Sequence, residues 1–199
     1  GIPIWTTTPW TLPANLAIAL HPDFEYVAVD AGNDEVFILA RELVENGMKT
    51  FGISDYEIIT DMDVKSLEHK RSRHPMVERE SIIILGDHVT LEAGTGCVHT
   101  APGHGREDYE VGLEYGLDVY SPVDDNGQFT DDVEFFRGQF VFDANKNINK
   151  TLGEIGAMVA ERSIEHSYPH CWRCKQPVIF RATPQWFISM DKTGLRRDS

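Results

Sequence analysis

Three consecutive threonines, Thr6, Thr7 and Thr8, form the first segment whose residue types suit chemistry. Hydroxyl groups both donate and accept hydrogen bonds, and Pro9 interrupts regular strand pairing. Hydroxyls and unpaired backbone groups are therefore free to meet a ligand where the predicted strand stops. The residues alone leave open the simpler alternative, a threonine-rich edge strand that ends at a proline.

A second segment, residues 94–109, combines four glycines with His99, His104 and Asp108. Glycines let the backbone approach a ligand closely. The segment does not match the dinucleotide-binding fingerprint, because His99 occupies the position of the third glycine. Asp108 lies near the start of a predicted helix, whose dipole favours the ionised carboxylate, a natural partner for an ammonium group.

Two alternatives for this segment stay open at the level of the residues. One is a glycine-rich turn whose histidines are merely solvated or hydrogen-bonded. The other is a metal-dependent hydrolase in which His99, His104 and Asp108 bind a divalent ion that keeps open positions.

The cysteines indicate half of a metal site. Cys171 and Cys174 form a CxxC pair, which supplies two of the four ligands of a tetrahedral zinc site, while Cys97 stands alone. His166 and His170 are candidate substitutes for the missing ligands. We expect two reduced thiols without metal, with a non-catalytic zinc-ribbon-like module as the alternative. An odd number of cysteines does not suit a disulfide framework and favours a reducing cytoplasm.

The elements that must position these residues are many short strands interrupted by a few helices, which predicts an α+β domain. Hydrophobic periodicity and turn residues place the elements. Strands are expected over residues 4–8, 15–20, 26–31, 35–39, 81–85, 178–182 and 185–190. Helices are expected over residues 41–49, 106–115 and 144–160, the last capped by Asp143.

Composition limits the function classes. The 199 residues are 41% hydrophobic and suffice for one large globular domain. A formal net charge of −14 argues against a domain that holds nucleic acid tightly by itself. No apolar run approaches the roughly 20 residues of a membrane helix, so no membrane partner is expected. Neither end has the character of a natural terminus, so we expect a piece of a longer chain.

Taken together, residues 5–15, 94–109 and 166–187 resemble the editing insertion of bacterial isoleucyl-tRNA synthetases. The resemblance runs along the whole chain and is least distinctive over residues 64–80. The valyl and leucyl relatives have an arginine after their threonine pair, where this chain has Thr8, Pro9 and Trp10. The resemblance implies a distorted β-barrel with peripheral helices. It also implies an editing core over residues 1–162 and C-terminal strands over residues 163–199 that return toward the synthetase body.

The reaction implied by this resemblance is hydrolysis of valine from mischarged Val-tRNA(Ile). A pocket for isoleucine rejects valine poorly, because one methylene changes the binding free energy by only about 1–3 kcal/mol. This family is the standard example of that limit. A second, smaller pocket then hydrolyses what fits it. The implied partners are the 3′ end of tRNA(Ile) carrying valine and the remainder of the parent synthetase. No cofactor is implied for editing, although a second CxxC in the full-length parent would complete a zinc site.

The resemblance also assigns roles to individual residues. Asp108 would bind the amino group of the misattached valine, while Thr11 and His99 would flank its side chain and exclude isoleucine. The remaining residues would hold the terminal adenosine and the ester, help to place the attacking water, support that region or line the pocket: Thr6, Thr7, Thr8, Trp10 and Asn15. Water would attack with help from a ribose hydroxyl, and neither a protein nucleophile nor a catalytic metal is implied.

Overall fold

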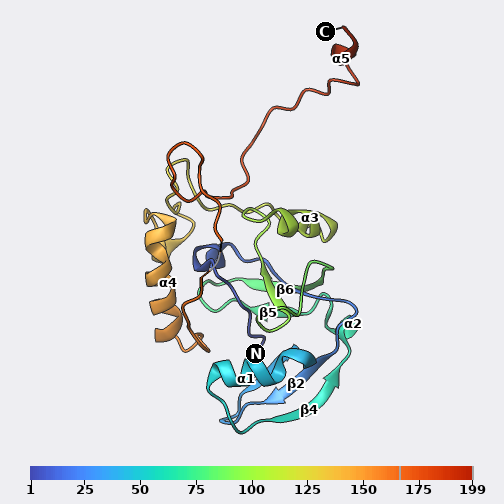
Figure 1. Cartoon of the computed structure of the whole chain (residues 1–199), viewed down its shortest axis with the longest axis vertical. Helices are drawn as coiled ribbons and strands as arrows, with labels where there is room; N and C mark the ends of the chain where they lie inside the picture. The colour runs from blue at the N-terminus through green and yellow to red at the C-terminus, as the bar shows by residue number, and fades with distance from the viewer. Residues whose placement is uncertain (166, 199) are drawn as a thin grey trace.

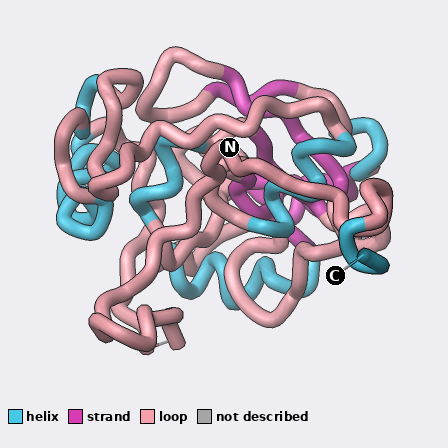
Figure 2. Tube along the Cα trace, turned by 90° about the horizontal axis from the view of Figure 1, so that it is seen from above, coloured by secondary structure: helices cyan, strands magenta, loops and turns pink. Residues whose placement is uncertain are grey.

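The computed structural model describes residues 1–165 and 167–198. Its named strands form two separate sheets. The four-stranded sheet has the order β5-β6-β1-β7 and the three-stranded sheet has the order β3-β2-β4. Figure 2 shows the strands gathered in the interior of the trace, with helices and long loops around them. The strand bounds are β1 Ala17–Leu20, β2 Tyr26–Asp30, β3 Val36–Ala40, β4 Glu57–Met62, β5 Arg71–Arg73, β6 Glu80–Leu85 and β7 Cys97–Thr100.

Strand β1 lies at the centre of the four-stranded sheet. It pairs in parallel with β6 and antiparallel with β7, with Ile18 opposite both Ile83 and His99. All four residues of β1 are buried, as expected of a strand that is covered on both faces. This register fixes His99 in the middle of β7, directly beside the chain that leaves η1 (Pro9–Ala14).

The three-stranded sheet is covered by a helix that lies between β3 and β4 in the chain. A short 3-10 turn, η2 (Arg41–Leu43), leads into α1 (Val44–Phe51), which ends at Gly52 in the left-handed conformation that glycine favours. Val44 and Met48 pack with the buried residues of β2 and β3. Figure 1 shows α1 beside β2 and β4, apart from α4 (Val141–Glu154).

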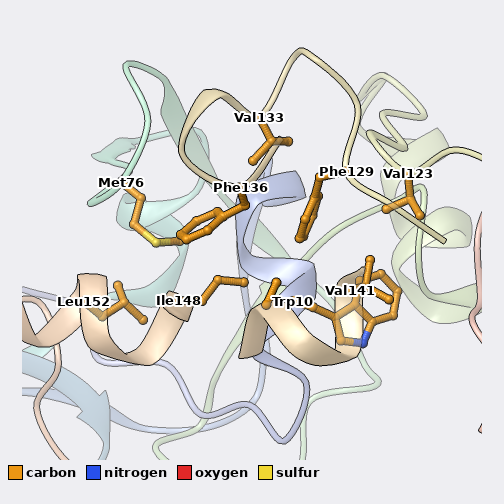
Figure 3. Packing of buried hydrophobic residues seen from close by; sticks show 10 residues of the cluster. Trp10, Met76, Val123, Phe129, Val133, Phe136, Val141, Ile148 and Leu152 are labelled. Carbon is orange, nitrogen blue, oxygen red and sulfur yellow. The ribbon is translucent and has the colours of Figure 1, made fainter. Parts of the chain in front are cut away.

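The largest cluster of buried residues joins η1 to α4. Trp10 is 2% exposed and packs with apolar residues of α4, of the segment before it and of the loop around Met76. Figure 3 shows Trp10 beside Val141 at one end of this cluster and Met76 beside Phe136 at the other. The amide of Trp10 donates a hydrogen bond of 2.9 Å to Asn145 Oδ1 of α4. Helix α4 therefore holds the start of η1 through both apolar packing and a polar contact.

The remaining helices are short: α2 (Val64–Leu67), α3 (Arg106–Glu114), η3 (Glu134–Phe136) and α5 (Leu195–Asp198). After about residue 182 the chain leaves the body and extends to α5 (Figure 1). Trp186 and Phe187 on this C-terminal extension are 100% and 90% exposed. Among the residues described, no helix is both long and apolar enough to cross a membrane.

The α+β class is confirmed, and the strands expected near residues 17, 26, 36 and 81 form. The expected strand over residues 4–8 is wrong, because the Thr8 amide bonds to Thr6 Oγ1 at 3.0 Å and bends the chain. Helix α4 begins at Val141 and ends at Glu154, so Asp143 lies inside it and caps nothing.

The C-terminal prediction needs a further correction. In the described part of residues 163–199 no strand forms, and an isolated bridge between His170 and Pro177 is the only β-pairing. Pro169, Pro177 and Pro184 have no N–H to donate and therefore interrupt strand pairing in this segment. The described strands form two open sheets and no closed barrel, so the distorted barrel stays a prediction, as does the division after residue 162.

Candidate functional site

A cavity of about 250 Å³ brings the two chemical segments together. Its lining comes from the loop before η1, from η1 itself, from β7, from the first turn of α3 and from the C-terminal segment. The lining residues are Thr6, Thr8, Trp10, Thr11, His99, His104, Asp108, Tyr168 and Phe180. Of the residues that the sequence singled out, Thr7 is exposed and Asn15 is buried, and neither is part of this lining.

Thr8 and Thr11 form one side of the cavity, and the turn that begins η1 gives this side its shape. The carbonyl oxygen of Thr8 accepts hydrogen bonds from the Thr11 amide at 3.0 Å and from the Thr11 hydroxyl at 2.9 Å. Pro9 at the first position of η1 suits this turn, because its fixed φ is already helical and its missing N–H needs no partner. Thr8 and Thr11 are thereby held on the same side of the cavity.

His99 is buried beside Thr11, with both ring nitrogens engaged by protein groups. Its Nε2 lies 2.8 Å from Thr11 Oγ1 and its Nδ1 lies 3.2 Å from Asn15 Nδ2. Burial lowers the pKa of His99 to about 4, with smaller contributions from the charges that His74 and His104 can carry. The imidazole is therefore neutral at physiological pH. Because both of its nitrogens are hydrogen-bonded to protein groups, the ring acts through its size and position and not as a general base.

Asp108 supplies the carboxylate of the cavity from the first turn of α3. Its Oδ2 accepts a hydrogen bond of 2.8 Å from the Ala101 amide. Burial raises the pKa of Asp108, and the hydrogen bond from Ala101 opposes this effect only in part. A cation that enters the cavity would favour the ionised form, which is why this position suits an ammonium group.

Gly105 allows the Asp108 carboxylate to fold back over the start of α3. A Cβ atom added at Gly105 would lie 2.9 Å from Asp108 Cγ and 3.0 Å from its Oδ2. These distances are far below ordinary van der Waals contact. Glycine is needed here for this close approach, whereas its backbone φ of −138° is available to any residue.

His104 connects the cavity to the C-terminal segment. Its Nδ1 donates a hydrogen bond of 2.9 Å to the Phe180 carbonyl, and its ring meets Trp10 edge-on at a centroid distance of 5.0 Å. Burial lowers the pKa of His104. Tyr168 and Phe180 complete the cavity, and sequence reasoning missed both, because their segment was expected to form strands directed elsewhere.

The metal-hydrolase alternative finds no support in this geometry. His99, His104 and Asp108 line one cavity, yet within residues 1–165 and 167–198 no three His, Cys, Asp or Glu side chains are grouped to hold a metal ion. The hydrogen bonds of His99 to Thr11 and Asn15 also occupy the nitrogens that a metal would need.

The CxxC pair lies in a tight turn near the protein surface. The Lys175 amide donates to the Cys171 carbonyl at 2.9 Å, and the Cys171 amide donates to the Gln176 carbonyl at 2.8 Å. Backbone hydrogen bonds from Cys174 and Arg173 lower the pKa of the Cys171 thiol. This turn places two thiols together on the surface, as a half site requires.

The other candidate zinc ligands do not join this turn. His170 Nδ1 donates to the Tyr168 carbonyl at 2.8 Å, and His166 lies outside the described residues. Cys97 is buried in β7, far along the chain from the CxxC turn, and burial raises its pKa to about 12. The structure thus shows the two thiols of the predicted half site without a further described ligand beside them.

Curated relatives match this chain along nearly its whole length. The isoleucine–tRNA ligase of Syntrophotalea carbinolica is 56% identical over 193 residues, which are 97% of this chain and 21% of that protein. The isoleucine–tRNA ligase of Lawsonia intracellularis is 58% identical over 199 residues, covering 100% of this chain and 21% of its own length. The chain thus spans about a fifth of the length of these relatives. No protein-family profile matches it.

Solved structures share the fold at lower identity. The structure of GlLeuRS-CP1 superposes with a TM-score of 0.61 at 18% identity, covering 80% of this chain and 83% of its own. The editing domain of the P. knowlesi cytosolic leucyl-tRNA synthetase superposes with a TM-score of 0.58 at 12% identity, covering 75% and 79%. These similarities establish the fold of the chain.

Proposed function

Because this chain is homologous to a segment of isoleucine–tRNA ligases and has the fold of synthetase editing domains, we propose that it hydrolyses the ester of valine on tRNA(Ile). The observation that supports this proposal is the small cavity of about 250 Å³, whose lining includes Asp108 together with Thr6, Thr8 and Thr11. A misattached amino acid brings an ammonium group and an aliphatic side chain to such a cavity.

The ammonium group of the substrate would bind Asp108. A charge-assisted hydrogen bond contributes roughly 1.5–3 kcal/mol, and burial strengthens it. The Ala101 amide orients one carboxylate oxygen, so the other remains for the substrate. This contact fixes the amino acid at one end and leaves its side chain directed toward Thr11 and His99.

The side chain of valine would lie against Thr11 and His99, which a hydrogen bond of 2.8 Å joins into one continuous wall. Both residues are buried, at 7% and 8% exposure, so neither can move aside without disturbing the core. The side chain of isoleucine is longer by one methylene, which would clash sterically with Thr11 and His99. Rejection by overlap discriminates more strongly than the loss of one attractive contact.

Water would be the nucleophile. The lining threonines, Thr6 and Thr8, offer hydroxyl and backbone groups that can hold the terminal adenosine and place a water molecule against the ester. A modest acceleration then comes from positioning the water and the ester, with the neighbouring ribose hydroxyl as the group that shares the proton. His99 would take no part in proton transfer, because its ring nitrogens are hydrogen-bonded to Thr11 and Asn15. Its role would be steric.

The surrounding assembly is part of the proposal. The net charge of −14 gives this chain little attraction for a polyanion, so affinity for tRNA would come from the rest of a parent synthetase in the cytoplasm. Cys171 and Cys174 would contribute half of a zinc site that the parent completes.

The experiment that tests the function measures release of valine from Val-tRNA(Ile) by the 199-residue chain, present in large excess over the tRNA so that weak binding does not limit the rate. The informative variant is Asp108→Asn, which keeps an acceptor for the Ala101 amide and removes only the charge. We expect it to lose at least about ten-fold in rate. Glu114→Gln is the matched control, because Glu114 is an exposed acid at the far end of the same helix. Near-normal hydrolysis by a folded Asp108→Asn variant would contradict the proposed role.

A further inference from the structure

Ser81 is a buried hydroxyl behind the cavity that neither motif contains. It lies at the start of β6, is 3% exposed, and donates a hydrogen bond to Asn15 Oδ1. The carbonyl oxygen of the amide can only accept, so the serine must be the donor. This contact anchors one side of the Asn15 amide away from the cavity.

The other side of the same amide is fixed independently. Asn15 Nδ2 donates to the Ala17 carbonyl at 2.8 Å, and a backbone carbonyl can only accept. The same nitrogen lies 3.2 Å from His99 Nδ1. An amide nitrogen can only donate, so His99 Nδ1 must be the unprotonated nitrogen of the neutral ring. From this side, the proton of the imidazole is placed on Nε2.

The opposite end of the chain of hydrogen bonds gives the same answer. The single hydroxyl proton of Thr11 points to the Thr8 carbonyl at 2.9 Å. Its oxygen can therefore only accept from His99 Nε2, which lies 2.8 Å away. The Thr8 carbonyl, just before η1, and the Ala17 carbonyl in β1 can only accept. The donors between them therefore run from Asn15 Nδ2 to His99 Nδ1, from His99 Nε2 to Thr11 Oγ1 and from the Thr11 hydroxyl to Thr8, so both ends assign the Nε2–H form.

The geometry points to Ser81 and Asn15 as positioning residues that set the tautomer of His99 and thereby hold the size-selective wall in place. If the ring protonated Nδ1 instead, Nε2 would demand the Thr11 hydroxyl proton and withdraw it from the Thr8 carbonyl. The bend that supports Thr8 and Thr11 would then lose a contact. This inference about specificity rests on the proposed function, whereas the tautomer itself does not.

The tautomer is tested by long-range ¹H–¹⁵N correlation spectra of the 199-residue chain labelled at histidine, with His99→Gln used to identify the His99 signals. We expect a neutral His99 protonated at Nε2. In Ser81→Ala the buried Asn15 Oδ1 loses its donor, so the amide should rotate to accept from the protein, and a second tautomer of His99 should become populated. Ser81→Thr keeps the hydroxyl and should restore the original spectrum. Ser72→Ala is the matched control, because Ser72 is the cross-strand neighbour of Ser81 in β5.

The same variants are compared in hydrolysis of Val-tRNA(Ile) and Ile-tRNA(Ile). Loss of the anchor should reduce the preference for the valyl ester by roughly ten-fold, as expected for a buried acceptor left without its donor. An Nδ1–H ring in the unaltered chain would overturn the assignment. An unchanged tautomer or an unchanged preference in folded Ser81→Ala would overturn the role of Ser81. If the unaltered chain showed the expected tautomer but hydrolysed neither ester, the proposed function would fail while the assignment stood.

Discussion

Replacing His99 with alanine separates a steric wall from a general base at the centre of the cavity. The substitution removes the two hydrogen bonds of the ring, each worth about 1 kcal/mol net. It leaves one N–H of the Asn15 amide without its partner, whereas the Thr11 hydroxyl still reaches the Thr8 carbonyl and the second Asn15 N–H still reaches the Ala17 carbonyl. With the lost packing included, we expect the free energy of unfolding to fall by roughly 2–3 kcal/mol.

The effect on the reaction should differ between the two esters. Opening the wall relieves the overlap with the extra methylene of isoleucine, so hydrolysis of Ile-tRNA(Ile) should rise by roughly 10- to 200-fold. Hydrolysis of Val-tRNA(Ile) should stay within about ten-fold of its original rate, because Asp108 and the threonines remain. The assay follows deacylation of both esters under single-turnover conditions, beside a thermal unfolding curve of each protein.

A general base would behave differently. Its removal would lower the rates on both esters by about 10²- to 10⁴-fold without any gain on isoleucine. His21→Ala serves as the control. The His21 ring stacks on the Phe24 ring with 3.9 Å between the ring centroids, and His21 is not part of the cavity lining. An equal loss on both esters in His99→Ala, with His21→Ala unaffected, would refute the wall and establish the base.

Three further predictions follow from the same geometry. Gly105→Ala should displace the Asp108 carboxylate, because the new Cβ would lie 2.9 Å from Asp108 Cγ, and should slow valine release at least about ten-fold; deacylation rates check this. Stability should fall as the pH drops from about 6.5 toward 4, because the unfolded chain binds more protons there than the folded chain; unfolding curves across that range would show it. The buried histidines with lowered pKa that cause this effect are His74, His99 and His104. The chain alone should retain no stoichiometric zinc after dialysis, since Cys171 and Cys174 supply two of four ligands; metal analysis by mass spectrometry tests it.

The sequence predicted the central strands well, because their apolar character is local. The four buried residues of β1 and the continuous apolar run of β6 need no knowledge of their neighbours to be identified. The segment over residues 4–8 was misassigned for a physical reason: β-branched threonines favour strands, but the Thr6 side chain bonds to the Thr8 amide and bends the chain. The strand propensities of the individual residues do not reveal side-chain to backbone contacts of this kind.

The candidate site was predictable only where its residues lie within a motif. His99 and Asp108 belong to one glycine-rich segment, and the cavity brings both beside Thr8 and Thr11. Ser81 could not be identified, because a single serine in an apolar strand carries no signal until its partner Asn15 is known to lie beside it. Long-range contacts of this kind depend on the register of β1 against β6, which pattern analysis does not specify.

The position of Trp10 has an optical consequence. Indole emission shifts to longer wavelength in water, and Trp10 is 2% exposed, whereas Trp172 and Trp186 are 74% and 100% exposed. A chain in which Trp5, Trp172 and Trp186 are replaced by phenylalanine would therefore emit from Trp10 alone. Because this indole lies in the core and also lines the cavity, its spectrum would report unfolding as a red shift. Entry of a ligand would appear as a change in intensity, so binding could be titrated without a label.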